Sequence, residues 1–181
     1  MTETLFDELR PRLVEALAGA RRVAVLGCGS SLRGDDGLGA LVAERLADTQ
    51  LIREQFDGMR ASARIGVFRG DTAPENFSGE IKNFGPDVLL VVDTANMGLP
   101  PGTAALIPTE EIGGVSFSTH RLPLRIMLDY LRRETGCRVY LLCVQGATLA
   151  FGADMTPEVL SSADMVTFLL FDLLKYIGRE K

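Results

Sequence analysis

Residues 23–39 constrain the fold more than any other part of this 181-residue chain. An apolar run opens the stretch, a Gly/Ser turn interrupts it, and the adjacent carboxylates Asp35 and Asp36 come next. Apolar residues then recur at helical spacing. The pattern predicts a buried strand over Val23–Cys28, a loop, and a helix over Asp35–Ala47. In an open α/β sheet such a loop lies at the carboxyl end of a strand, where ligands usually bind.

The remainder of the chain continues this alternation. Continuous apolar runs are typical of strands buried on both faces, and apolar residues every three or four positions indicate helices. Pro11 lies inside the first amphipathic stretch and predicts a kink or two short pieces there. We expect strands over Arg64–Arg69, Val88–Thr94, Thr103–Pro108 and Arg138–Val144, and helices over residues 4–18, Leu122–Glu134 and from Thr156 to about Gly178.

The alternation of strands and helices predicts a three-layer α/β/α sandwich with a mostly parallel, roughly five-stranded sheet. The connection between Asp93 and Thr103 is too short for a crossover helix, so the strand at 103–108 should run antiparallel to its predecessor. No linker divides the chain, and a hydrophobic content of 46% suffices for one core, so we expect a single domain over residues 1–181. Residues 1–20 form an amphipathic helical extension, which could cover a sheet edge or mediate self-association.

Composition excludes several classes of function. A net charge of −5 without a basic patch argues against nucleic acid as a partner. The 3 cysteines have no paired spacing, which fits a reducing cytoplasm rather than a disulfide framework or a zinc site. The acidic N-terminus does not have the pattern of a secretory signal. The longest apolar run is interrupted by Asp172 and Lys175, so membrane insertion is not expected.

Two familiar motifs are incomplete. Gly27 and Gly29 match the start of a dinucleotide-binding G-x-G-x-x-G sequence, but Leu32 stands where the third glycine is needed. No G-x-S-x-G nucleophile motif occurs anywhere in the chain. Cys28 could pair with His120 as in a cysteine hydrolase, yet its apolar context favours an inert, buried thiol.

Three side chains are candidates for a metal site. Asp36 follows the first strand, Asp93 ends the most apolar run, and His120 is the 1 histidine of the chain. Each has a structural alternative, because Asp93 could cap a turn and one of the adjacent pair Asp35 and Asp36 could cap the helix. Two carboxylates and an imidazole would together suit a divalent transition metal.

These residues belong to longer stretches that resemble a known family, the hydrogenase maturation endopeptidases. Its opening motif, G-x-G-N-x-L-x-x-D-[DE]-x-x-G, is similar to GCGSSLRGDDGLG here, with Ser30 in place of the usual Asn. Further similar stretches are GDTAPEN over residues 70–76, VVDTANMGLPPG over residues 91–102 and STHRLPL over residues 118–124. Their order resembles the subgroup that processes formate-hydrogenlyase-type, energy-converting [NiFe]-hydrogenases.

The resemblance implies a cytoplasmic endopeptidase that removes a C-terminal extension from the precursor of a [NiFe]-hydrogenase large subunit after nickel insertion. It also implies that Asp36, Asp93 and His120 contact a nickel ion carried by the substrate, a site that other divalent metals could also occupy. Two alternatives remain open at this stage. One is a nucleotide-binding α/β domain, and the other is a non-catalytic protein that docks on a metalloenzyme precursor.

Overall fold

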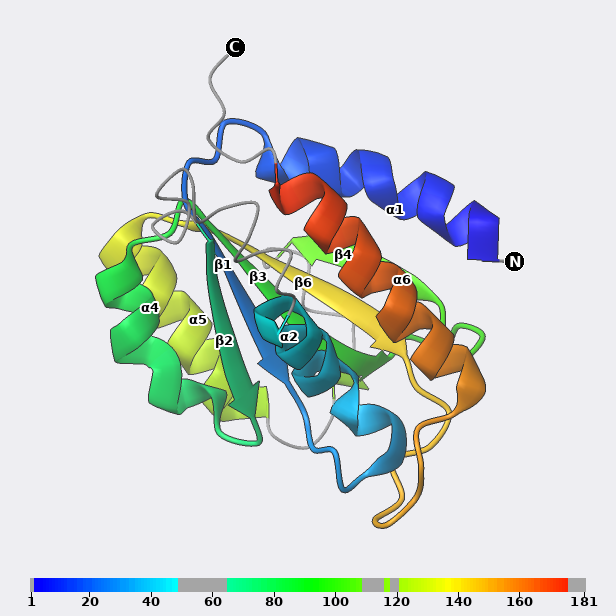
Figure 1. Cartoon of the computed structure of the whole chain (residues 1–181). Helices are drawn as coiled ribbons and strands as arrows, with labels where there is room; N and C mark the ends of the chain where they lie inside the picture. Colours follow the sequence, from blue (N-terminus) through cyan, green and yellow to red (C-terminus); the bar gives the residue numbers. More distant parts are fainter. Residues whose placement is uncertain (1, 49–64, 109–115, 118–120, 176–181) are drawn as a thin grey trace.

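A computed structural model describes residues 2–48, 65–108, 116–117 and 121–175 of the chain. A mixed sheet forms its centre, with the strand order β2-β1-β3-β6-β4 (Figure 1). A further two-residue strand, β5 (Ser116–Phe117), pairs with β3 off this path. The strands of the main path are β1 (Val23–Cys28), β2 (Ile65–Asp71), β3 (Val88–Asn96), β4 (Ala104–Pro108) and β6 (Arg138–Gln145).

The strand directions confirm the predicted mostly parallel sheet. Strands β2, β1, β3 and β6 are parallel to one another, whereas β4 is antiparallel to β6 and β5 is antiparallel to β3. Strand β4 therefore runs opposite to its predecessor β3, as its short connection predicted, although β6 separates the two. Consecutive strands β1 and β2 extend the sheet to one side and β3 starts the other, which creates a topological switch point between β1 and β3.

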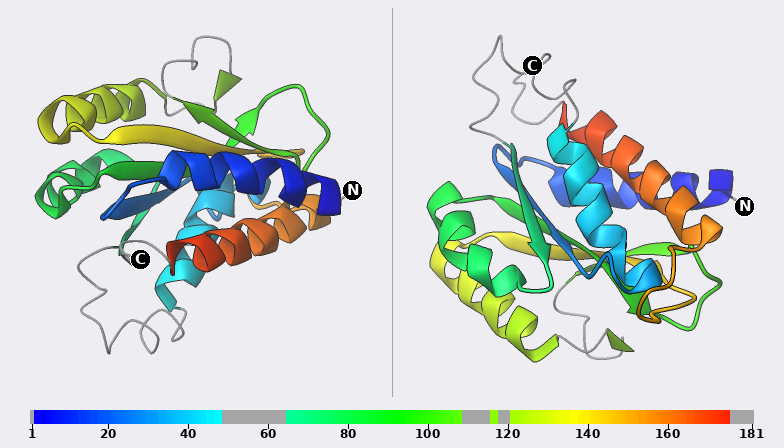
Figure 2. Two further views of the ribbon diagram at one scale, coloured as in Figure 1. Left: turned by 90° about the horizontal axis from the view of Figure 1, so that it is seen from above. Right: turned by 60° about the horizontal axis from the view of Figure 1, so that its bottom comes forward.

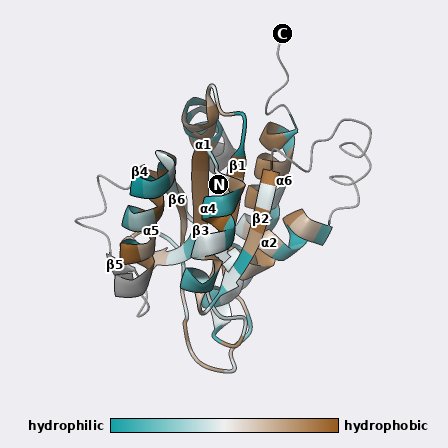
Figure 3. Ribbon diagram, turned by 90° about the vertical axis from the view of Figure 1, so that its left-hand side faces the viewer, coloured by the Kyte–Doolittle hydropathy of each residue, from teal (hydrophilic) through white to brown (hydrophobic). Residues whose placement is uncertain are grey.

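Helices cover both faces of the sheet and complete the three layers (Figures 1 and 2). Helices α1 (Thr2–Leu17), α2 (Leu38–Asp48) and α6 (Pro157–Leu174) contribute to the larger core cluster on one face. Helices α4 (Ser78–Phe84) and α5 (Arg121–Thr135) contribute to the cluster on the other face. Hydrophobic residues concentrate on the strands between these helical layers (Figure 3).

Strand β1 shows how one segment serves both cores. Its alternate residues Val23 and Val25 belong to the larger cluster, and Ala24 and Leu26 belong to the opposite one. Each of these four side chains has no exposed surface. A strand buried on both faces must be apolar at every position, which explains the continuous apolar run of the sequence.

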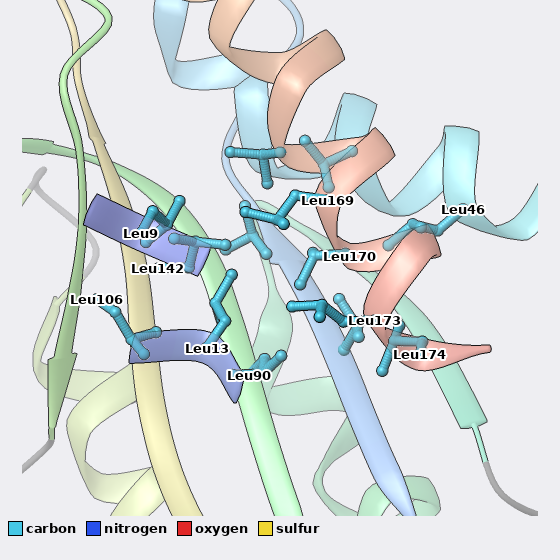
Figure 4. Close-up of a cluster of buried hydrophobic side chains, with 14 of the residues drawn as sticks. Leu9, Leu13, Leu46, Leu90, Leu106, Leu142, Leu169, Leu170, Leu173 and Leu174 are labelled. Carbon is cyan, nitrogen blue, oxygen red and sulfur yellow. The ribbon is translucent and has the colours of Figure 1, made fainter. Parts of the chain in front are cut away.

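Helix α1 packs over β4 and α6. Its residues Leu9 and Leu13 lie in the same cluster as Leu106 of β4 and the leucines of α6 (Figure 4). The guanidinium of Arg10 also donates a hydrogen bond to the Asp172 carboxylate at 2.8 Å. The helix continues through Pro11, so the prediction of two short pieces is wrong.

Some elements differ from the sequence-based expectation. The helix expected from Asp35 is two elements, a 3-10 turn η1 (Gly34–Gly37) followed by α2. A second 3-10 turn, η3 (Pro74–Phe77), begins at a proline, whose fixed φ suits the first position of a helix. Helix α4 was not predicted, since seven residues with one buried apolar side chain show no clear period. No helix within the described ranges is long and apolar enough to cross a bilayer.

Candidate functional site

The candidate site lies where β1 and β3 separate at their carboxyl ends. The pairing of the two strands runs from Val23↔Val88 to Gly27↔Val92. Beyond this point β1 ends at Cys28 and its chain turns away, while β3 continues through Asp93 and stays paired with β6, where Asp93 faces Cys143. Asp93 therefore lies within the predicted strand, and the alternative that it caps a turn is wrong. Crevices of this kind are the usual ligand sites of open α/β sheets.

Asp36 is held inside the turn that follows β1. Asp36 is only 3% exposed, and its Oδ2 accepts a hydrogen bond of 3.0 Å from the Ser30 backbone N–H. The turn can wrap this closely because Gly29 has a φ of +112°, and a Cβ there would lie 1.7 Å from the Asp36 carbonyl oxygen. Gly29 and the Asp36 carboxylate are thus parts of one turn, which follows the strand that contains Gly27.

Asp93 is fixed in a similar way. It is 6% exposed, and its Oδ1 accepts a hydrogen bond of 2.7 Å from the backbone N–H of Thr94. The Thr94 hydroxyl in turn donates to the Asp35 carbonyl oxygen at 2.7 Å. This contact ties β3 directly to η1, so the segments that carry Asp93 and Asp36 are joined.

The pKa of the Cys28 thiol depends on the charges around the crevice. Burial raises its pKa well above the usual value, and the negative charges of Asp93, Glu75 and Asp36 raise it further. Both predicted carboxylates thus act on the same buried group. The thiol stays protonated, which agrees with the inert role expected for Cys28 and speaks against a cysteine nucleophile. Glu75 was not among the predicted site residues, although it lies in the GDTAPEN stretch that carried the resemblance.

Asp35 has a different task from its neighbour. Its Oδ2 accepts hydrogen bonds from the backbone N–H groups of Ala147 (2.7 Å) and Thr148 (3.0 Å). Its Oδ1 accepts two more from Thr156, one from the backbone N–H (2.7 Å) and one from the hydroxyl (2.9 Å). One carboxylate of the pair is structural, as expected, but it fastens the loop before α6 rather than capping the helix that follows it in sequence.

The third predicted ligand, His120, lies outside the described residues, so its position relative to Asp36 and Asp93 stays a prediction. Within the described ranges, no group of three or more His, Cys, Asp or Glu side chains is arranged to hold a metal ion. Asp36 and Asp93 by themselves supply two carboxylates. Carboxylate oxygens suit divalent cations, and hydrogen bonds such as those from Ser30 and Thr94 orient ligating groups.

A cleft of about 360 Å³ adjoins the turn that holds Asp36. Its walls include Gly29, Ser30 and Leu32 from the turn, together with Asp71 at the end of β2 and Met155 before α6. Asp71 has a φ of +45°, and its carbonyl oxygen accepts a hydrogen bond of 2.7 Å from the Gly29 N–H.

The fold and the site define an α/β protein with two buried carboxylates at the switch point of its sheet, and comparison with known proteins gives the family. The model of the HycI hydrogenase maturation protease family matches residues 42–170. The chain belongs to this family, and it is an endopeptidase of hydrogenase maturation. The match includes Asp93 and His120 and begins after Asp36.

Individual relatives agree with this assignment. The hydrogenase 3 maturation protease of Escherichia coli is 33% identical over 139 residues, which is 76% of this chain and 81% of that protein. The crystal structure of the [NiFe] hydrogenase maturation protease HycI from Thermococcus kodakarensis has a TM-score of 0.77 and 28% identity, over 91% of this chain and 99% of that one. The solution structure of the endopeptidase HycI from Escherichia coli has a TM-score of 0.65 and 30% identity, over 87% and 92% of the two chains.

Proposed function

We propose that this endopeptidase removes the C-terminal extension from the precursor of a [NiFe]-hydrogenase large subunit after nickel insertion. In this proposal the nickel is part of the substrate. Asp36, Asp93 and His120 contact it and so recognise the loaded precursor. Formate-hydrogenlyase-type hydrogenases are the proposed class of substrate. The similarity of this chain to HycI proteins supports that choice.

One observation carries the proposal. Asp36 and Asp93 come from different segments of the chain, yet both are buried, and the hydrogen bond from the Thr94 hydroxyl to the Asp35 carbonyl oxygen joins the two segments beside them. Two negative groups gathered at an apolar switch point cost free energy unless a cation offsets their repulsion. A divalent ion delivered by the substrate provides that compensation at the moment of binding.

The chain's own residues then position the substrate. The backbone N–H groups of Ser30 and Thr94 hold the two carboxylates in fixed orientations, so little ordering is needed when the metal arrives. A nickel ion bound near the cleavage point tethers the scissile bond in the crevice, and such proximity lowers a reaction barrier by several kcal/mol. The ion can also polarise the carbonyl group that is attacked.

The same arrangement provides selectivity for mature precursor. A ligand shifts binding only by its difference in affinity between two states. Without nickel, the precursor brings nothing that neutralises Asp36 and Asp93, so it binds weakly. Nickel-free precursor is therefore expected to stay intact.

Nucleotide binding is the weaker alternative for the crevice. In dinucleotide-binding folds, the backbone N–H groups of the glycine turn and the helix N-terminus bind phosphate. Here the Ser30 N–H already donates to the Asp36 carboxylate, and Asp35 and Asp36 both lie in the first turn of η1. These negative charges would repel a phosphate group.

Replacement of the carboxylates tests the proposal. We expect Asp36→Asn and Asp93→Asn to slow cleavage of nickel-loaded precursor on the order of 100-fold or more, because a neutral amide binds a cation weakly. His120→Ala is expected to have a similar effect. The measurement is the size shift of the precursor on a denaturing gel, with nickel-free precursor beside it.

Asp129→Asn is the matched control, since Asp129 is an exposed carboxylate on α5. It should cleave at the normal rate, and all variants should unfold as cooperatively as the original protein. Normal cleavage by all three site variants would refute the assignment of the site. Binding of loaded precursor without any shortening by the unmodified protein would instead favour a docking role.

A further inference from the structure

We propose that three exposed apolar side chains beside the carboxylate site form the surface on which the folded body of the protein substrate docks. The three are Leu32, Leu149 and Phe151, called the rim patch below. This inference rests on the proposed function, because it assigns a binding surface to the substrate of that same site. It concerns the folded part of the substrate and not its cleaved tail.

The rim patch is formed by two loops that touch. Leu32 is 62% exposed in the turn after β1, and Phe151 is 81% exposed in the loop between β6 and α6, where Leu149 also lies. The Gly152 N–H donates a hydrogen bond of 2.8 Å to the Leu32 carbonyl oxygen. The side chain of Arg33 donates to the Leu149 carbonyl oxygen at 3.4 Å. Leu32 therefore lies beside the loop of Leu149 and Phe151, although it is more than a hundred residues away in sequence.

The loops are held so that these side chains stay in water. Asp35 anchors the loop between β6 and α6 with its four hydrogen bonds to Ala147, Thr148 and Thr156. The Gly34 N–H adds a hydrogen bond of 3.1 Å to the Ala153 carbonyl oxygen. These hydrogen bonds fix the backbone on both sides of Phe151, whose ring is exposed. An apolar group presented in a preorganised loop binds a partner with little further loss of entropy.

The rim patch adjoins the turn that holds Asp36. Leu32 lines the cleft together with Ser30 and Gly29, whose backbone surrounds that carboxylate. Both loops lie at the end of the sheet where β1 and β2 terminate, at the bottom of the view in Figure 1. An enzyme that cuts a protein near its C-terminus must hold the rest of that protein against the rim of the site. The rim patch is the apolar part of that rim.

Other exposed apolar residues do not combine these features. Among the residues whose burial the structure describes, the others lie on helices, apart from Leu99 in the turn before β4, and such scattered residues are normal on protein surfaces. They are Val14 on α1, Ile126 and Tyr130 on α5, and Leu160 and Phe168 on α6. A second copy of this chain is a less suitable occupant for the rim patch, because it would cover the cleft that the substrate must enter.

The test compares Phe151→Ser and Leu32→Ser with Phe168→Ser, whose ring is 62% exposed on α6. The probe is the nickel-loaded large-subunit precursor of the host's own [NiFe]-hydrogenase. We expect the two rim variants to raise KM about tenfold, as for loss of a well-placed apolar anchor. Their kcat should change little, because the carboxylates are untouched. The Phe168→Ser protein should match the original in both constants.

The outcomes separate this inference from the proposed function. If the unmodified protein leaves the loaded precursor intact, the proposed function fails and the docking surface fails with it. If the unmodified protein cleaves, but both rim variants keep its KM, the docking surface alone is refuted. Sedimentation provides a further check, since an unmodified dimer that becomes monomeric in Phe151→Ser would assign the rim patch to self-association. Equal thermal midpoints would show that the rim variants are folded.

Discussion

The adjacent carboxylates Asp35 and Asp36 have different partners in the fold. Asp35 has no exposed surface and binds a loop more than a hundred residues away in sequence, whereas Asp36 is held by the nearby Ser30 N–H. Neighbouring side chains of a helical turn point in different directions, so the sequence could predict that the pair divides its roles. It could not predict the partners of Asp35, because Ala147, Thr148 and Thr156 carry no local mark of that contact.

The role of Asp35 leads to a pH-dependent prediction. Burial alone would raise its pKa, but the hydrogen bonds from Thr148, Thr156 and Ala147 outweigh burial and keep the pKa below its usual value. A carboxylate with a lowered pKa stabilises the fold above its unfolded-state pKa of about 3.9, and this stabilisation is lost as the pH falls through the folded-state pKa. We expect Asp35→Asn to cost about 2–3 kcal/mol at pH 7, since the amide group would face backbone donors.

The measurement is urea unfolding of the original protein and Asp35→Asn between pH 7 and pH 3. The difference in unfolding free energy should shrink toward the acid end, because the Asp35 carboxyl group of the unfolded chain takes up a proton below about pH 3.9. Asp129→Asn provides the control, because Asp129 is an exposed carboxylate on α5. A difference that stays constant across the pH range would show that the charge of Asp35 does not stabilise the loop.

Among the elements, α2 is the one whose position the site most depends on. It starts directly after η1 and packs against β1 and β3. The close approach occurs at Gly39, where a Cβ would lie 2.1 Å from the Val92 carbonyl oxygen and 2.3 Å from that of Cys28. The last glycine of the motif is thus required by packing, and the turn that carries Asp36 is placed by that contact.

Substitution at this glycine should be costly. We expect Gly39→Ala to lower the free energy of unfolding by about 2 kcal/mol or more, because backbone atoms of two strands must move to admit the methyl group. Gly79→Ala in α4 is the matched control, since a Cβ there meets nothing within 4 Å. It should leave stability unchanged or raise it by up to about 1 kcal/mol through helix propensity. Chemical denaturation measures both, and equal stability of the two variants would contradict the packing role.

Sequence patterns predicted most elements for physical reasons that can be named. Strands β1, β3 and β6 are buried on both faces, so each appears in the sequence as a continuous run of apolar residues. Helix α4 and strand β5 are too short to show a recognisable pattern of apolar residues in the sequence. The helix predicted at the start of the chain is confirmed, but its division into two pieces at Pro11 is wrong, since Leu9 and Leu13 pack on either side of the proline in one continuous helix. In the site, Asp36 and Asp93 were predicted from their places after apolar runs, whereas Glu75 sits in an exposed turn without such a context.

The molecule as a whole includes α1 as part of its core. Leu13 has no exposed surface and packs in the cluster shared by α1, β4 and α6, while Val14 beside it is 51% exposed. The extension predicted for residues 1–20 therefore covers one end of the sheet and contributes to stability. Its removal would expose the edge strand β4 and the apolar face of α6.

Two neighbouring residues test this view of α1. We expect Leu13→Ala to cost about 3 kcal/mol, as for other buried leucines, and Val14→Ala to stay within about 0.5 kcal/mol. Urea unfolding monitored by circular dichroism measures both values. Equal effects of the two substitutions would mean that α1 is not held against the sheet in solution. Neither residue lies near the carboxylates, so cleavage by the folded fraction should be unchanged.

The dispersal of the site along the chain makes the site depend on the fold. Asp36 reaches the crevice through η1 and Asp93 through β3, and the two meet only when β1 and β3 are side by side. A nascent or partly unfolded molecule therefore does not have the two carboxylates of the proposed site together. Any metal binding that needs both carboxylates is therefore expected to be lost together with the fold, so that loss of metal affinity would report unfolding of the sheet.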